Sequence, residues 1–386
     1  MIYLDHAATT PLDPAVISVM ENIHHTCYAN PSSIHSLGQQ SKVLLESSRK
    51  TIANSIGAKT SEIVFTSGGT EANNLALIGA AKANRNSGNH IITSKVEHPA
   101  ILETCKFLSE NGYRITYIDV DLNGMLDLNQ LHEAICNETI LISLMMVNNE
   151  TGCLLPVNEV AETTKEKDII FHSDAVQAFG KIDIDMTHLN VDLLTLSAHK
   201  IYGPKGCGAL YIRQGTKIES ILYGGAQEAG RRAGTENLGT IAGFAEAVNQ
   251  LKKHSTSFRS LQDLGRLFEK MLKDEFKNLE INGENTQRVA GLSNVYFPFM
   301  AGDSLLMNLD LHQIAVSTGS ACSSGSHKAS HVLKAMGYDE QRVNNSLRFS
   351  LGRGTTKDEI LTTVDVLKKI YNNINNESAA PPRKIY

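Results

Sequence analysis

The sequence predicts an α/β protein, in which a large domain with a mainly parallel, seven-stranded sheet is joined to a smaller α+β domain. The first observation is that short apolar runs alternate with helical patterns between residues 62 and 212, which is typical of a sheet covered by helices. The second is chain length, because 386 residues, 41% of them hydrophobic, exceed a typical single domain and can bury a large core. The seven runs are Glu62–Thr66, His90–Thr93, Ile115–Ile118, Ile140–Val147, Ile169–His172, Leu193–Ser197 and Gly208–Ile212.

The chain after these runs divides into a loop, a helix and a second pattern. Arg213–Asn237 is glycine-rich without clear periodicity, which predicts a long loop, and Leu238–Lys253 has the pattern of a helix. Beyond residue 258, two helical segments flank two short strands, which predicts the smaller domain. These elements lie near Leu261–Phe276, Ser293–Phe297, Ser346–Ser350 and Ile360–Asn373. We expect a large domain at 15–255 and a small domain formed by 1–14 and 256–386, ending in a mobile tail from Ala379.

Composition narrows the classes of partner and compartment. With 36 basic and 41 acidic side chains, a net charge of −5 and no dense Lys/Arg run, we expect neither direct nucleic-acid binding nor membrane binding. The longest apolar run, Ile140–Val147, is far shorter than the roughly 20 residues that cross a bilayer. The six cysteines form no C-x-x-C pair, and the N-terminal residues lack a secretion-signal pattern. We therefore expect a cytoplasmic protein without a disulfide framework or a structural zinc site.

A glycine turn follows the first predicted strand. Thr66-Ser67-Gly68-Gly69-Thr70-Glu71 leads into a helix rich in alanine and leucine. Glycines allow the backbone to approach an oxyanion, and the amides at a helix N-terminus attract phosphate. The alternative is a turn that only caps its helix, which is the commoner role of this pattern.

Two further polar motifs follow later strands. Asp174 could keep a ring nitrogen protonated, although an isolated aspartate after a strand is more often a helix cap. Lys200, in Ser197-Ala198-His199-Lys200, could form a Schiff base with an aldehyde cofactor, although most lysines are solvated surface charges. A glycine turn, an aspartate and a lysine, in this order and each after a strand, are what a fold type I pyridoxal-phosphate enzyme needs.

Over essentially its whole length, the sequence resembles the cysteine desulfurases of the class V aminotransferase group. The resemblance is carried by Tyr3-Leu4-Asp5-His6-Ala7-Ala8-Thr9-Thr10-Pro11, Asn30-Pro31-Ser32-Ser33, Thr93 to His98, Asn148-Asn149-Glu150, His199 to Gly206 and Arg231-Arg232-Ala233-Gly234-Thr235. It implies a fold type I transferase that uses pyridoxal 5'-phosphate as cofactor and L-cysteine as substrate.

The resemblance also implies which residues hold the cofactor phosphate and the substrate. The phosphate would be held by Gly69, Thr70, Ser197 and His199. Thr235 would reach the cofactor of a neighbouring subunit, so a homodimer is implied. Arg348 would bind the substrate carboxylate together with Asn149, whereas the residues alone favour a surface or edge-strand salt bridge for Arg348.

The remaining roles that the resemblance implies concern the cofactor ring. Asn149 and Gln177 would contact the ring oxygen, and Asp174 the ring nitrogen. His98 would stack on the ring and transfer protons, although the residue alone suits a turn before a helix equally well. Lys200 would bind the cofactor aldehyde covalently.

Cys322 lies in a stretch rich in glycine and serine, at about residues 317–330, which predicts a flexible loop that exposes its thiol. The loop resembles that of the desulfurase subgroup with a long cysteine-bearing loop. Cys322 would then accept sulfur as a persulfide, pass it to an iron–sulfur scaffold or a tRNA-thiolating enzyme, and could be a transient iron–sulfur ligand. The other cysteines are expected to be buried and inert; they are Cys27, Cys105, Cys136, Cys153 and Cys207.

His327 and His331 stand at i and i+4, a spacing that could place two imidazoles on one helix face for a metal. Since no third ligand with fitting spacing follows, two merely polar histidines are the commoner case.

The sequence thus predicts a cysteine desulfurase that converts L-cysteine to L-alanine. Two alternatives stay open. A class V aminotransferase or selenocysteine lyase on the same scaffold would need Lys200 and Asp174 but no mobile cysteine. A sulfur carrier or scaffold protein would act through its contacts rather than through turnover.

Overall fold

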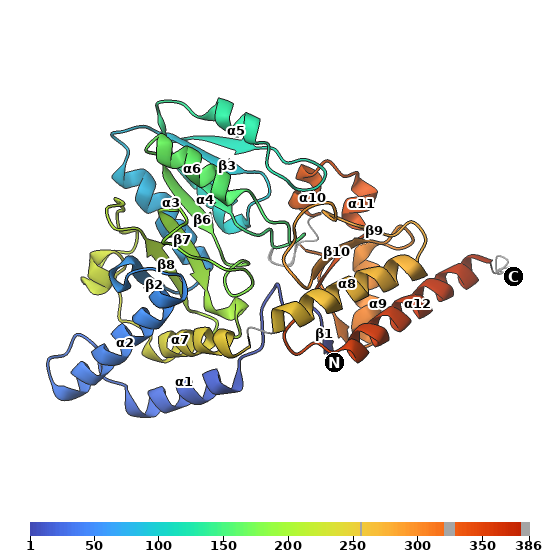
Figure 1. Ribbon diagram of the computed structural model, residues 1–386, viewed down its shortest axis with the longest axis horizontal. Coiled ribbons are helices and arrows are strands. Elements are labelled where there is room, and N and C mark those ends of the chain that lie inside the picture. Colours follow the sequence, from blue (N-terminus) through green and yellow to red (C-terminus); the bar gives the residue numbers. More distant parts are fainter. Residues whose placement is uncertain (255–256, 320–328, 380–386) are drawn as a thin grey trace, which may run out of the picture.

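The computed structural model describes residues 1–254, 257–319 and 329–379 (Figure 1). Its largest element is a seven-stranded sheet with the strand order β2-β8-β7-β6-β5-β3-β4. Within this sheet β8 runs antiparallel to β2 and β7, and the other pairs are parallel. The strands are β2 (Ile63–Thr66), β3 (His90–Ser94), β4 (Arg114–Ile118), β5 (Thr139–Met145), β6 (Ile170–Asp174), β7 (Leu193–Ser197) and β8 (Gly208–Ile212). The predicted α/β class and all seven predicted strands are confirmed, with ends that shift by at most two residues.

Helices cover both faces of this sheet (Figure 1). Successive strand residues point to opposite faces, so Leu193 belongs to the core beneath α3 and α4, whereas Leu194 belongs to the core beneath α6 and α7. Because both faces are buried, the strands other than the edge strand β4 read as largely apolar runs, which is why the sequence revealed them. The helices are α3 (Gly69–Ala83), α4 (Pro99–Glu110), α5 (Leu128–Ala134), α6 (Val157–Glu166) and α7 (Leu238–Lys253). The predicted bounds of α7 are confirmed, and the predicted loop before it contains only a short 3-10 turn, η3 (Gln227–Gly230).

Two N-terminal helices, α1 (Pro14–Thr26) and α2 (Ser36–Ser55), pack against α7 and were not predicted. Helix α1 begins with a usual start signal, since Asp13 accepts a hydrogen bond from Ala15 N and proline occupies the first helical position. The buried face of α2 includes Ser41 and Ser48, so small polar residues interrupt the apolar stripe that would identify a helix.

A second hydrophobic core lies in the C-terminal part and includes Leu4, Phe268, Phe297 and Phe349. It is built on a three-stranded antiparallel sheet, β12-β10-β9, and on β1 (Ile2–Tyr3), which pairs in parallel with β11 (Ile314–Ala315). The strands of the larger of these sheets are β9 (Glu280–Ile281), β10 (Leu292–Tyr296) and β12 (Ser346–Ser350). The domain boundaries near residues 15 and 255 stay a prediction.

The helices of this part are α8 (Ser257–Glu275), α9 (Gly302–Leu311), α10 (His331–Ala335), α11 (Glu340–Asn344) and α12 (Lys357–Ala379). Helix α12 extends six residues beyond the predicted end at Asn373, so it includes Ala379, where the tail was predicted to begin. Residues 380–386 of that tail, like Cys322, lie outside the described residues. Among the described residues, no helix combines the length and the apolar character that a membrane span requires.

Candidate active site

The predicted site residues meet at one edge of the large sheet. Asp174 ends β6, Lys200 lies in the 3-10 turn η2 (Ala198–Lys200) directly after β7, and Asn149 follows β5 by a few residues. The carboxyl ends of β2 and β7 both pair with Gly208, which brings the glycine turn beside Ser197. Carboxyl ends of parallel strands form the usual ligand site of an open α/β sheet.

The glycine turn leads into α3 in a shape that suits an anion. Gly68 has a φ of 152°, in the region that favours glycine, and a Cβ at Gly69 would lie 2.8 Å from Val176 Cγ2. The first amides of a helix have no partner within it, and Ser197 Oγ is buried without a hydrogen-bond partner among the described residues. A phosphate group would satisfy these donors, so the residues fit it. Thr70 is exposed at the same helix start.

Asp174 is a buried carboxylate at the end of β6, and the helix cap that an isolated aspartate favours is wrong, because a turn and no helix follows before β7. Its Oδ1 accepts a hydrogen bond from Val176 N at 2.9 Å, and its Oδ2 accepts one from Asn73 Nδ2 at 2.7 Å. Its exposed fraction is only 6%. Asn73, one turn into α3, was not predicted, because its contact depends on α3 packing against the end of β6.

Lys200 is not a solvated surface lysine. Its Nζ donates hydrogen bonds to the carbonyls of Ala7 and Ala8, at 2.6 and 2.7 Å. The carbonyl of Ala7 also accepts one from Gln177 Nε2 at 2.8 Å, so the N-terminal segment connects the two side chains. Gln177 Oε1 in turn accepts a hydrogen bond from Lys181 Nζ at 2.6 Å. Burial, together with the charges of Lys200 and Arg348, lowers the pKa of Lys181 to about 7.

His98 caps α4 and lies near Asp174 and Lys200. Its Nδ1 accepts a hydrogen bond from Ala100 N at 3.1 Å, so a neutral ring carries its proton on Nε2. Burial lowers the pKa of His98, an effect that Asp174 opposes and Lys200 reinforces. The predicted cap is therefore present, and it fixes the orientation of the imidazole.

Glu97, directly before His98, is a buried carboxyl group that was not predicted. Its Oε1 accepts hydrogen bonds from Ser94 Oγ and Met145 N, at 2.7 and 3.0 Å. Burial raises the pKa of Glu97 to about 8 against the opposing effect of these bonds.

His199 and Thr235 are the remaining residues predicted to contact the phosphate. His199 is half-buried, whereas Thr235 is exposed. His199 Nδ1 lies 3.1 Å from Thr9 Oγ1, and burial lowers the pKa of His199 to about 4, so its ring is neutral at pH 7 and donates one hydrogen bond. Thr235 is exposed on the loop between β8 and α7.

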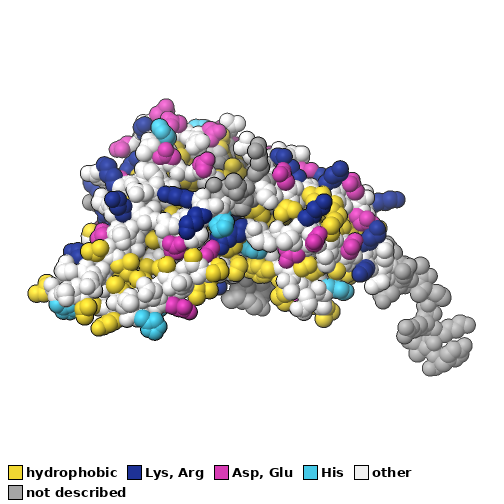
Figure 2. Space-filling view, turned by 60° about the horizontal axis from the view of Figure 1, so that its bottom comes forward, with side chains coloured by type: hydrophobic (Ala, Val, Ile, Leu, Met, Phe, Trp, Pro, Cys, Tyr) yellow, Lys and Arg dark blue, Asp and Glu magenta, His cyan; other side chains and the backbone are white. Residues whose placement is uncertain are grey.

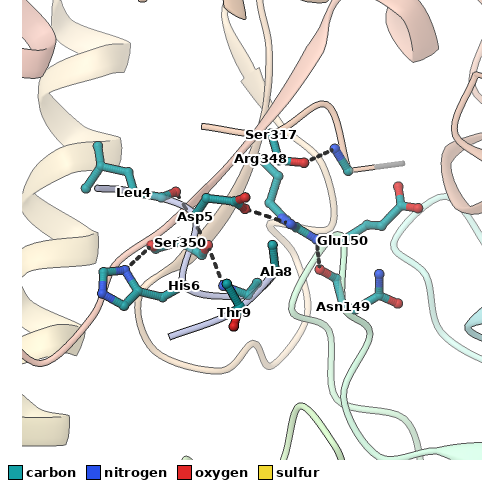
Figure 3. Close-up of polar contacts among 12 residues, drawn as sticks. Leu4, Asp5, His6, Ala8, Thr9, Asn149, Glu150, Ser317, Arg348 and Ser350 are labelled. Carbon is teal, nitrogen blue, oxygen red and sulfur yellow. Dashed lines mark hydrogen bonds and ion pairs between the residues drawn. The ribbon is translucent and has the colours of Figure 1, made fainter. Parts of the chain in front are cut away.

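Arg348 is buried, so the surface position that its sequence context favours is wrong, but the edge-strand ion pair is present: Arg348 lies on β12, at the edge of its sheet, and pairs with Asp5. Figure 3 shows its guanidinium between Asp5 and Asn149: Nη2 donates to Asp5 Oδ1 at 2.8 Å and Nη1 to the carbonyl of Asn149 at 2.9 Å. The Arg348 backbone forms two hydrogen bonds with Ser317. Nε is also buried, and it has no hydrogen-bond partner among the described residues. Asp5 belongs to the N-terminal motif, but its pairing with Arg348 was not predicted.

The histidine pair predicted near the cysteine loop is only partly described. Cys322 and His327 lie outside the described residues, and His331 Nε2 lies 2.8 Å from the carbonyl oxygen of Glu97. Within the described ranges, no three His, Cys, Asp or Glu side chains form a group that could hold a metal ion.

Of the five cysteines predicted to be buried, only Cys105, Cys153 and Cys207 are. Cys27 is half-buried and Cys136 is exposed. A hydrogen bond from Thr139 lowers the pKa of Cys136, and Arg114 contributes to the same effect. The surroundings of Cys136 therefore favour the thiolate, which is the reactive form.

Comparison with known proteins agrees with this geometry. The family model described as aminotransferase class-V matches residues 2–362. A cysteine desulfurase IscS of Dictyoglomus turgidum is 45% identical over 98% of this chain and 96% of its own length. The cysteine desulfurase IscS of Methanosarcina thermophila is 45% identical over 99% and 95% of the two chains.

Solved structures give the same result. A NifS-like protein superposes with a TM-score of 0.90 at 33% identity, covering 96% of this chain and 99% of that one. A structure of SspA in complex with cysteine gives a TM-score of 0.82 at 36% identity, covering 92% and 100%. Since both the family model and these relatives span nearly the whole chain, the protein belongs to the class V aminotransferase family, whose members use pyridoxal phosphate, and within it to the cysteine desulfurases.

Proposed function

We propose that this chain binds pyridoxal 5'-phosphate, converts L-cysteine to L-alanine and holds the sulfur as a persulfide on Cys322. The observation that carries the proposal is the meeting of Lys200, Asp174 and the glycine turn at one edge of the sheet. Each of these motifs has a common structural role by itself, but a half-buried ammonium, a buried carboxylate and an anion cradle at one edge fit this cofactor.

The chain offers a contact for each part of the cofactor. The phosphate would be held by Gly69, Thr70, Ser197 and His199, and by Thr235 of a second subunit. The ring nitrogen would face Asp174, which Asn73 orients, and the ring oxygen would face Asn149 and Gln177. Lys200 would bind the aldehyde, and His98 would cover the ring. When bound, this cofactor withdraws electrons from the α-carbon of an amino acid.

The chain's own residues would carry out binding, proton transfer and sulfur capture. Arg348 would hold the carboxylate of cysteine, while Asp5 and Asn149 fix the guanidinium. Lys200 Nζ would remove the α-proton, and His98 Nε2 would exchange a proton with the substrate thiol. The Cys322 thiolate would attack the substrate sulfur, so that an S–S bond forms as the C–S bond breaks with its electron pair on the carbon side. The β-carbon and then the α-carbon would each take up a proton, and alanine would leave.

Two substitutions test the assignment. Lys200→Ala should abolish the absorbance of covalently bound cofactor, whereas Cys322→Ser should keep it and stop alanine and persulfide formation. After incubation with cysteine, mass spectrometry should map the persulfide to Cys322. Undiminished turnover in the serine variant, or a persulfide on another cysteine such as the exposed Cys136, would contradict the proposal. Activity toward keto acids without alanine release from cysteine would favour an aminotransferase.

We also propose a cytoplasmic homodimer that passes sulfur to an acceptor protein, such as an iron–sulfur scaffold or a tRNA-thiolating enzyme. Large apolar side chains are exposed on α1 and α2, and between them. They include Ile17, Tyr28, Ile34, Leu37 and Val43. Figure 2, in which the lower side of Figure 1 comes forward, shows hydrophobic side chains gathered along the lower part of this face. Such a surface suits a second copy of the chain.

A further inference from the structure

Lys181 forms a hydrogen bond with Gln177, the side chain proposed above to contact the ring oxygen of the cofactor. We propose that Lys181 is a positioning residue, whose ammonium group holds the Gln177 amide so that Nε2 faces both the Ala7 carbonyl and the ring oxygen. This inference rests on the proposed function, and it gives a role to a lysine that was not predicted to belong to the site.

A tight turn brings Lys181 back to Gln177. The chain after β6 turns at Gly180, which has a φ of +76°, and Lys181 N donates a hydrogen bond to the carbonyl of Ala178 at 2.9 Å. A Cβ at Gly180 would lie 2.9 Å from Leu251 Cδ1, so a residue larger than glycine does not fit at this turn. The backbone therefore holds Lys181 beside Gln177, which lies four positions earlier in the chain.

Both ends of the Gln177 amide have a partner that fixes its orientation. Lys181 Nζ donates to Oε1 at 2.6 Å, and an ammonium group can only donate, so the atom beside it is the oxygen. Nε2 donates to the Ala7 carbonyl at 2.8 Å and carries a second hydrogen, which a cofactor oxygen could accept. Since Gln177 is only 5% exposed, loss of Lys181 would leave Oε1 buried without its donor, and the amide would no longer be held at both ends.

The Ala7 carbonyl depends on this arrangement once Lys200 binds the cofactor. It accepts hydrogen bonds from Gln177 Nε2 and from Lys200 Nζ, which also donates to the carbonyl of Ala8. A lysine that has bound an aldehyde covalently has fewer hydrogens to donate, so Gln177 would then hold the Ala7 carbonyl. Lys181 would thus act on the N-terminal segment and on the cofactor through one amide group.

The surroundings of Lys181 make its contact with Gln177 necessary. The charges of Lys200 and Arg348 add to the effect of burial, and together they lower the pKa of Lys181 to about 7. The described side chains that line the cavity beside Lys181 include no carboxylate, and Gln177 Oε1 is the acceptor that partly offsets this cost. A positive charge at this place also favours a negative charge on a cofactor oxygen beside Gln177. The charged or titratable side chains that share the cavity with Lys181 are His6, Lys200, Tyr202, His254 and Arg353.

The first test compares Lys181→Met with a matched control, Lys205→Met. Methionine keeps most of the length of lysine but has neither a donor nor a charge. Lys205 is exposed, and none of the hydrogen bonds of Gln177 involves it. In the full chain without cofactor, amide hydrogen exchange in a peptide that covers residues 4–10 should be faster in Lys181→Met than in the parent, and unchanged in Lys205→Met.

The second test follows the absorbance of the covalently bound cofactor as a function of pH. A donor and a positive charge beside the ring oxygen favour the less protonated form, so Lys181→Met should raise the midpoint by at least about half a pH unit. The kcat for alanine formation should fall by about twofold to tenfold, the effect of one hydrogen bond of ordinary strength, with an unchanged KM for cysteine because Arg348 keeps its partners. Lys181→Arg, which retains a donor and a charge, should stay closer to the parent in each measurement, and Lys205→Met should match the parent.

A double substitution decides whether Lys181 acts through Gln177. If it does, Lys181→Met should change the exchange of residues 4–10 and kcat in the parent but add little to either in a Gln177→Ala background. Additive effects, unchanged exchange in Lys181→Met, or equal behaviour of the methionine and arginine variants would overturn the inference. If the parent shows no absorbance of covalently bound cofactor, the proposed function fails instead, and the exchange measurement still decides whether Lys181 holds the Gln177 amide.

Discussion

The buried ion pair between Arg49 and Glu228 allows a quantitative test of how the glycine-rich loop is fixed. Both terminal nitrogens of Arg49 contact Glu228, at 2.5 and 2.8 Å, and Phe65 N donates to the same carboxylate at 2.8 Å. The side chains are 9% and 1% exposed. The pair therefore connects α2, strand β2 and η3 in the loop that leads to Thr235.

Glu228→Ala would remove the carboxylate that both terminal nitrogens of Arg49 contact, leaving the buried guanidinium with the Ile63 carbonyl at 3.0 Å and the half-exposed Glu46 at 3.4 Å. Breaking a buried pair in this way costs about 3–5 kcal/mol, and the unsatisfied Phe65 N–H adds about 1–3 kcal/mol unless water enters. We expect a loss of at least about 3 kcal/mol in the free energy of unfolding, a large fraction of the roughly 5–15 kcal/mol typical of a folded protein.

Urea unfolding followed by circular dichroism measures this loss, since the chain contains no tryptophan for fluorescence. Asp119→Asn is the control, because it removes an ion pair with Lys95 whose side chains are 47% and 46% exposed, and exposed pairs contribute less than about 1 kcal/mol. A loss below about 1 kcal/mol for Glu228→Ala, equal to that of the control, would refute the role assigned to the buried pair.

Four further substitutions test other features. Gly79→Ala should cost about 1–3 kcal/mol despite the better helix propensity of alanine, since its Cβ would lie 2.5 Å from the carbonyl oxygen of Glu219; an increase in the urea midpoint would contradict this. Burial lowers the pKa of His172 to about 3, whereas the pKa of a histidine in the unfolded chain is about 6.5. The neutral, buried His172 therefore contributes its full stabilisation above about pH 6.5, and this contribution is lost as the pH falls below that value. His172→Gln should therefore lose less stability than the parent between pH 7 and pH 5, measured by urea midpoints. The raised pKa of Glu97 acts in the opposite direction. The contribution of this carboxyl group to the free energy of unfolding is complete below about pH 4.5 and is lost as the pH rises towards 8. Glu97→Gln should therefore be more stable relative to the parent at pH 8 than at low pH. Arg348→Lys should raise the KM for cysteine by about tenfold or more, because an ammonium cannot replace the planar fork and charged hydrogen bonds contribute about 1.5–3 kcal/mol; an unchanged KM would exclude this residue as the carboxylate contact.

The sequence allowed prediction of what depends on local pattern. The strands other than the edge strand β4 were visible because both of their faces are buried, and Asp174 and Lys200 were visible because they stand at or just after the ends of such strands. Helix α2 was not visible, since its buried face carries Ser41 and Ser48 in place of a continuous apolar stripe.

The missed site residues depend on contacts between distant parts of the chain. Asp5 and Arg348 are 343 positions apart, and Asn73 and Asp174 are 101 positions apart. No periodicity or spacing in one sequence identifies such pairs. Cys136 was wrongly predicted to be buried, because the general tendency of free cysteines says nothing of a residue in the short connection between α5 and β5.

The hydrogen bonds of the N-terminal segment also determine when the site can form during synthesis. Lys200 is held by carbonyls of Ala7 and Ala8, and the backbone of Ala7 is itself held by Ser350, since Ala7 N donates to Ser350 Oγ at 2.8 Å. Before Ser350 has been synthesised, a nascent chain already contains Lys200, Asp174 and the glycine turn. It still lacks strand β12, which carries the Ser350 hydroxyl that holds Ala7 beside Lys200. Stable capture of the cofactor would then follow translation of nearly the entire chain, so the chain's first residues and its last strand are completed as one structural unit.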